Sequence, residues 1–225
     1  MLRNLAGLAV GLVALLSVSA ANAAQGRRQP PPRPASSLEF TGATFSCLQY
    51  TNGLGGNSVG KMQSSLANLW AQGYLAGYYR GQGNLEFSDD PAARQVIDER
   101  LATLCATVPQ TSVLAVALKG IAIEPRKLPA TVVTEFSPST YTCGQHLDGK
   151  NGAAAAANRA DLAEMWAFAF IQGFKNVKQP EMLIDLENKP TLINLVLSDR
   201  YCGGSRDKLL MDATALLAER VKLAE

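Results

Sequence analysis

The sequence is poor in the side chains on which most catalytic and metal sites depend. It has one histidine, His146, and four cysteines in 225 residues. No two cysteines have the Cys-x-x-Cys spacing of common zinc sites. The lone histidine lies beside Asp148 without a serine to complete a nucleophilic triad. We therefore predict a non-enzymatic protein with no metal, no cofactor and no catalytic residues; a hydrolase that uses carboxylates alone is the remaining enzymatic alternative.

A strong charge of one sign is also missing. The formal net charge is +2, and four arginines (Arg3, Arg27, Arg28 and Arg33) lie in the first 34 residues, so the rest carries +2 − 4 = −2. Nucleic-acid binding requires a clearly basic face. We therefore predict that nucleic acid is not a partner.

The N-terminal segment has the pattern of a secretory signal peptide. Arg3 precedes the apolar run Leu5–Val18, and Ala21–Ala23 fits the small-residue cleavage rule. A membrane helix is the alternative, but the run ends in small residues rather than a stop-transfer pattern. We predict export, cleavage after Ala23 (residues 1–23) and no integral membrane segment in the mature chain. Residues 24–40, rich in Pro and Arg, are predicted to form a disordered tail.

Two stretches of the chain repeat each other. Leu66–Tyr78 and Leu162–Phe174 align the only two tryptophans, Trp70 and Trp166, at a separation of 96 residues. A cysteine lies 23 residues before each tryptophan. This register predicts a tandem duplication of one small module.

The repeat selects one disulfide pairing. Four cysteines in an exported chain predict two disulfides, and duplication pairs Cys47 with Cys105 and Cys143 with Cys202, 58 and 59 residues apart. Closing a loop of that size stabilises by about 4 kcal/mol in the chain-entropy model. Each module is marginal in size on burial alone, so the predicted bridge matters.

Helical periodicity predicts an all-α fold. In the first copy we expect a central helix from Ser64 or Ser65, with Trp70 in the core and Gly73 and Gly77 forming a flat strip for a close helix neighbour. Further helices are expected from Pro91 to Cys105, over Thr111–Ile123, from Pro190 (matched with Pro91 through a three-residue insertion) to Cys202, and after a cap at Ser205. The predicted architecture is two tandem disulfide-stapled helical modules, residues 41–123 and 140–225, joined by a linker, 124–139, with a short strand at 131–134.

A glycine-rich stretch gives a weak nucleotide-binding signal. Gly55–Lys61 fits Gly-x-x-x-x-Gly-Lys, but Met62 replaces the required Ser or Thr and no strand precedes it. We interpret Gly53–Lys61 and its counterpart Gly149–Ala157 as flexible loops. They are the predicted contacts in the event that the protein binds a specific partner.

The segments Thr44–Tyr50, Trp70–Gly77 and Cys105–Pro109 resemble the HdeA/HdeB family of small exported helical proteins, whose best-known members are periplasmic acid-stress chaperones. The first copy fits well; the second fits less well because His146 replaces the aromatic Tyr50. The resemblance implies a periplasmic location, no catalysis, and stapling by Cys47, Cys105, Cys143 and Cys202. It also implies an apolar surface that acid exposes to hold unfolding protein clients.

Two functions are therefore expected alternatives. One is the acid-activated chaperone that the resemblance implies. The other is an envelope interaction protein, such as an inhibitor or immunity protein with one specific partner.

Overall fold

The computed structural model describes residues 40–83, 91–116, 136–180 and 190–221. The predicted signal peptide (1–23), nearly all of the 24–40 tail, and the 131–134 strand with most of the linker lie outside the described residues. Those ranges contain helices, turns and two isolated β-bridges, so the all-α prediction is confirmed. They all belong to one compact unit, Ser36–Glu225.

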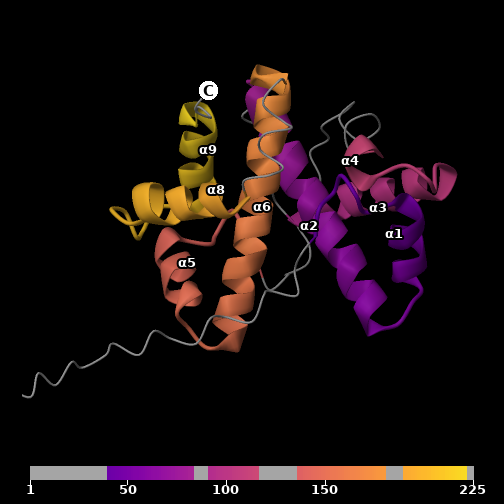
Figure 1. The fold of residues 1–225 in the computed structure, drawn as a ribbon, viewed down its shortest axis with the longest axis horizontal. Coiled ribbons are helices and arrows are strands. Elements are labelled where there is room, and N and C mark those ends of the chain that lie inside the picture. Colours follow the sequence, from indigo (N-terminus) through magenta and orange to yellow (C-terminus); the bar gives the residue numbers. More distant parts are fainter. Residues whose placement is uncertain (1–39, 84–90, 117–135, 181–189, 222–225) are drawn as a thin grey trace, which may run out of the picture. The chain divides into compact units, whose positions relative to one another are not determined.

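Each half has a short first helix and a long central helix, followed by shorter helices (Figure 1). The first half has α1, α2, α3 and α4, and the second half has α5, α6, α8, η3 and α9. Their bounds are α1 Cys47–Leu54, α2 Ser58–Gly81, α3 Pro91–Thr107, α4 Val113–Val116, α5 Cys143–Lys150, α6 Ala154–Lys178, α8 Pro190–Val196, η3 Leu197–Cys202 and α9 Leu210–Arg220.

Equivalent capping boxes open the two halves. The Ser46 hydroxyl accepts from the Gln49 backbone N–H at 3.2 Å, and the Gln49 side chain accepts from the Ser46 N–H at 2.8 Å. Thr142 and Gln145 repeat both bonds at the same distances. Reciprocal bonds of this kind satisfy two backbone donors that a helix start leaves unpaired. They fix where α1 and α5 begin, next to the first cysteine of each disulfide.

The central helix α2 begins earlier than predicted, whereas α6 begins at Ala154, within the helix-forming run Ala153–Ala157 from which an earlier start was expected. Asn57 caps α2 by accepting from the Gly60 N–H at 3.0 Å. Ser64, the predicted cap, instead donates its hydroxyl to the Tyr50 carbonyl at 2.8 Å inside the helix. The flexible loops predicted at Gly53–Lys61 and Gly149–Ala157 are therefore wrong for most of their length, because only the residues between Leu54 and Ser58, and between Lys150 and Ala154, lie outside helices.

The central helices pack against each other through glycine, as the strip predicted (Figure 1). A Cβ added at Gly77 of α2 would overlap the Phe170 carbonyl oxygen of α6. A Cβ added at Gly173 of α6 would overlap the Tyr74 carbonyl oxygen of α2. Because Tyr74 and Gly77 are the 96-residue equivalents of Phe170 and Gly173, each contact is repeated with the helices exchanged. This reciprocity is the property of a two-fold interface, here inside one chain.

Each half has its own core. Trp70 and Trp166 are 2% and 0% exposed, which confirms their predicted core role. Side chains from the opposite central helix complete each core: Met165 and Ala169 join the first, and Ala76 joins the second. The two halves therefore share buried surface along α2 and α6.

Both predicted disulfides are present. Cys47 bonds to Cys105, Cys143 bonds to Cys202, and all four side chains are buried. The first bridge joins α1 to α3, and the second joins α5 to η3. The chain has no free cysteine.

A one-residue insertion separates the two halves near the second disulfide. Buried Ile97 and Leu101 of α3 correspond to buried Ile193 and Leu197, an offset of 96. The offset becomes 97 at Cys202, and the extra residue is accommodated by the π-helix η3. Single-turn π-helices of this kind are rare overall, but those that occur are often found at functional sites. The match of Pro190 with Pro91 was therefore wrong: both prolines begin helices, but at positions that are not equivalent.

The last helix packs on its own half. α9 begins after Leu209, which forms a bridge with Thr142, and no side chain caps it. The predicted cap at Ser205 is wrong, because the Thr142–Leu209 bridge delays the helix. Gly203 follows the last residue of η3. The third helix, expected over Thr111–Ile123, is described only as α4.

Candidate functional site

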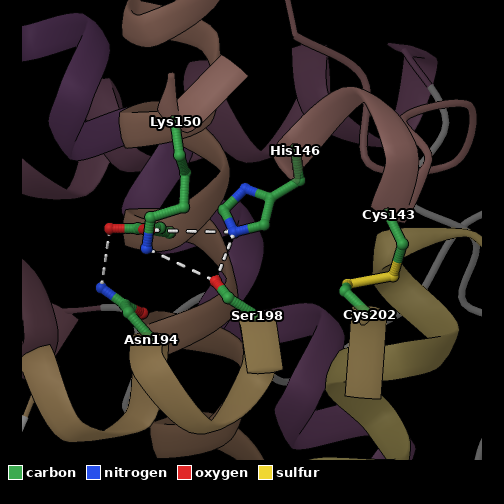
Figure 2. Close-up of polar contacts among 7 residues, drawn as sticks. Cys143, His146, Lys150, Asn194, Ser198 and Cys202 are labelled. Carbon is green, nitrogen blue, oxygen red and sulfur yellow. Dashed lines mark hydrogen bonds and ion pairs between the residues drawn. A yellow bond between two sulfur atoms is a disulfide. The ribbon is translucent and has the colours of Figure 1, made fainter. Parts of the chain in front are cut away.

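A buried polar cluster surrounds the only histidine (Figure 2). His146, on α5, has no exposed surface. Its Nε2 atom lies 3.1 Å from the Ser198 Oγ atom of η3 and 3.8 Å from the Glu164 Oε1 atom of α6. Three elements therefore meet at one imidazole, and the α6 member, Glu164, lies two residues before the buried Trp166.

A lysine and an amide hold the carboxylate in place. Lys150 Nζ lies 2.8 Å from Glu164 Oε1 and donates to Ser198 Oγ at 3.4 Å. Asn194 of α8 donates its amide to Glu164 Oε2 at 3.2 Å. Glu164 is thus contacted from both α5 and α8, and its negative charge balances the positive charge of Lys150. The imidazole of His146 is the neutral member of this cluster at pH 7.

Burial holds His146 in its neutral form. Removal from water, and then the positive charge of Lys150, lower the pKa of His146 to about 4 from an ordinary value of 6.5. The unfolded chain therefore binds a proton as the pH falls through about 6.5, whereas the folded chain does so only near pH 4. Stability present above pH 6.5 is lost between these values, by about 3 kcal/mol for a group without exposed surface.

The cluster does not have the geometry of a catalytic triad. Ser198 and Glu164 both approach Nε2, whereas a triad places its acid on the opposite ring nitrogen. His146 Nδ1 is buried without a hydrogen-bond partner. Ser198 is also buried, so no substrate reaches its hydroxyl. The chemistry that this arrangement allows is uptake of a proton by His146, which lowers the stability of the folded chain.

The first half has an uncharged pair in the same place. Tyr50, equivalent to His146, donates its hydroxyl at 2.7 Å to Asn68, equivalent to Glu164. Burial, and then the charge of Asp98, raise the pKa of Tyr50 to about 12, so this pair stays neutral throughout the acid range. Leu54 occupies the position of Lys150. The fold therefore forms without an ionisable pair at this site.

Apolar side chains are exposed where α1 meets α2. Leu54, Val59 and Met62 are 44%, 55% and 41% exposed, and they lie in or beside the predicted contact stretch Gly53–Lys61. Their equivalents in the second half are Lys150, Ala155 and Asn158. This apolar surface belongs to the first half alone.

Two further features are absent from the described residues. They contain no group of three or more potential metal ligands. None of their helices combines the length and apolar character that crossing a bilayer requires.

The sequence pattern marked His146 as the lone histidine beside Asp148 and as the replacement for an aromatic residue, but it predicted no polar cluster around it. Ser198 lies 52 residues away and Asn194 lies 48 residues away, so no local spacing joins them to it. The available signal was the repeat itself: a histidine and a glutamate stand 18 residues apart where the first copy has a tyrosine and an asparagine. Comparison with protein families, curated proteins and solved structures found no match to this chain.

Proposed function

We propose that this protein is an exported, non-enzymatic chaperone that binds unfolding proteins through apolar surface released in acid. The observation that supports the proposal is the sealed His146 cluster. A neutral imidazole without exposed surface, beside a lysine, makes the fold less stable as the medium becomes acidic. The fold therefore contains a specific group that responds to acid before general charge repulsion does.

General charge repulsion acts in the same direction. All 19 Asp and Glu residues follow Ala23, and 20 Lys and Arg residues do so as well. With the carboxylates protonated and His146 charged, the chain after Ala23 carries 20 + 1 = +21. Such a charge favours open conformations. The disulfides keep each half tethered, so opening releases core surface such as that around Trp166 without freeing the whole chain.

The proposal is tested by light scattering from an aggregating client protein between pH 2 and pH 7. We expect suppression of aggregation at pH 2–3 and little effect at pH 7, because the apolar core is covered at neutral pH. A matched control is the His146→Gln variant, which cannot gain the imidazole charge and should protect the client only at lower pH. Full protection at pH 7, or none at pH 2–3, would contradict the proposal.

The exposed residues Leu54, Val59 and Met62 favour a second function, binding of one specific envelope partner. Exposed apolar side chains that gather at adjoining helix ends are typical of a binding surface. A pull-down at pH 7 with the wild-type chain and with a Leu54→Ser/Met62→Ser variant separates the two functions. One stoichiometric partner that the variant loses supports this alternative, whereas no partner at pH 7 counts against it.

A further inference from the structure

The two halves differ in one place that bears on acid. The equivalents of His146, Lys150 and Glu164 are Tyr50, Leu54 and Asn68, which carry no charge at acidic pH. Elsewhere the halves share their caps, their disulfides and their reciprocal glycine contacts. One chain therefore contains the site with a histidine, a lysine and a glutamate in one half and, as a reference, with a tyrosine, a leucine and an asparagine in the other.

We propose that acid opens the second half first, around α5 and η3, while the first half stays folded and serves as its anchor. The inference rests on the proposed function, since it names which half releases the apolar surface. Protonated His146 would lie 3.1 Å from the Ser198 hydroxyl, which Lys150 also contacts at 3.4 Å, and it has no exposed surface. A second positive charge would then be buried beside that of Lys150, which is costly in the protein interior.

The groups that face His146 leave few alternative partners for the new charge. From α6 it meets Glu164, which is engaged by Lys150 and Asn194. From η3 it meets Ser198, whose hydroxyl is uncharged. Tyr141 and Arg159 interact electrostatically near Glu164 and supply no further negative charge. Opening α5 away from η3 is the remaining route by which the imidazolium reaches water.

The geometry also indicates why the first half does not follow. The Tyr50–Asn68 hydrogen bond has no group that gains charge in acid. Asp98 lies on α3 and accepts from Gln72 at 2.8 Å, and a carboxyl group cannot become positively charged. The half keeps its own disulfide and its own core. The contact of Gly77 with Phe170 holds α6 against α2 while α5 and η3 move.

Hydrogen exchange read by mass spectrometry on the oxidised full chain, corrected for intrinsic exchange, tests the inference. Between pH 7 and pH 3 we expect protection to fall by about 100-fold in α5 and η3, and by less than about 10-fold in α1 and α3. Equal loss in both halves, or earlier loss in the first, overturns the inference.

A variant that copies the first half provides the matched control. His146→Tyr/Lys150→Leu/Glu164→Asn should keep α5 and η3 protected at pH 3, and His146→Gln serves if the triple variant does not fold. Wild-type-like opening of a folded variant overturns the inference. Because exchange needs no client, its outcome is separate from the proposed function: selective opening without client protection removes only the function, and client protection with both halves opening together removes only the inference.

Discussion

Replacing Gly77 with alanine is expected to destabilise the folded chain by about 3 kcal/mol at pH 7. In an exposed helix the same change stabilises by about 1 kcal/mol, because alanine is the better helix former. Here the added methyl group would overlap the Phe170 carbonyl oxygen, which belongs to a rigid helix backbone that cannot turn aside. Gly173→Ala should cost a similar amount, since its methyl group would overlap the Tyr74 carbonyl oxygen.

Urea unfolding followed by tryptophan fluorescence measures both changes. Gly55→Ala is the matched control, because a Cβ at Gly55 meets nothing within 4 Å and its φ of −95° suits alanine. We expect that control to lie within about 0.5 kcal/mol of wild type. If Gly77→Ala were as stable as Gly55→Ala, the close contact between α2 and α6 would be disproved.

Removing either disulfide by paired alanine substitution is expected to cost about 2–5 kcal/mol. The bridges close loops of 58 and 59 residues, so the chain-entropy term is nearly the same for both. Each bridge also joins two buried positions of its own core. The Cys47→Ala/Cys105→Ala variant should therefore loosen the first core, and Cys143→Ala/Cys202→Ala the second.

The free energy of unfolding of the two variants, and of the wild type under reducing conditions, checks this. Hydrogen exchange then assigns each loss to a half. The expected result is a local loss in the half that lacks its bridge, with the other half still protected. Cross-linked peptides that join the two halves, or unchanged stability after reduction, would be inconsistent with two independently stapled halves.

Much of the fold could be predicted because its signals are local or repeated. Trp70 and Trp166 defined the register, and the register selected the disulfide pairing. The spacing of Gly73 and Gly77 indicated a close helix neighbour, although it did not identify α6 as that neighbour. These predictions depend on helical period and on chain length between equivalent residues, both of which the sequence contains directly.

The missed features depend on competition between local signals or on contacts distant in sequence. Asn57 and Ser64 are both good capping residues, and the choice is decided by the Tyr50 carbonyl, which binds the Ser64 hydroxyl. The π-helix η3 accommodates one extra residue. The sequence shows that residue as a cysteine separation of 59 in the second half against 58 in the first, but it does not show where the residue is inserted. The contact between His146 and Ser198 needs the folded chain, because 52 residues separate them.

The differences between the two repeated halves can be related to the proposed function. A symmetric pair of modules, fused in one chain, allows the halves to diverge while α2 and α6 keep their contact. The first half has a neutral Tyr50–Asn68 pair and exposed apolar residues such as Val59. The second half has an ionisable cluster and a π-helix beside it. Under the proposed function these are an anchor and an acid-responsive element.

The most direct test of this account is a pH titration of the His146 imidazole by nuclear magnetic resonance in the oxidised chain. His146 is the only histidine, so its ring resonances need no assignment by mutation. The account predicts neutral imidazole down to pH 5, a midpoint near pH 4, and loss of the folded second-half signals as the proton binds. Lys150→Met should move the midpoint upward, and Lys178→Met on the exposed end of α6 should not. A midpoint near 6.5 with the fold unchanged would contradict the account.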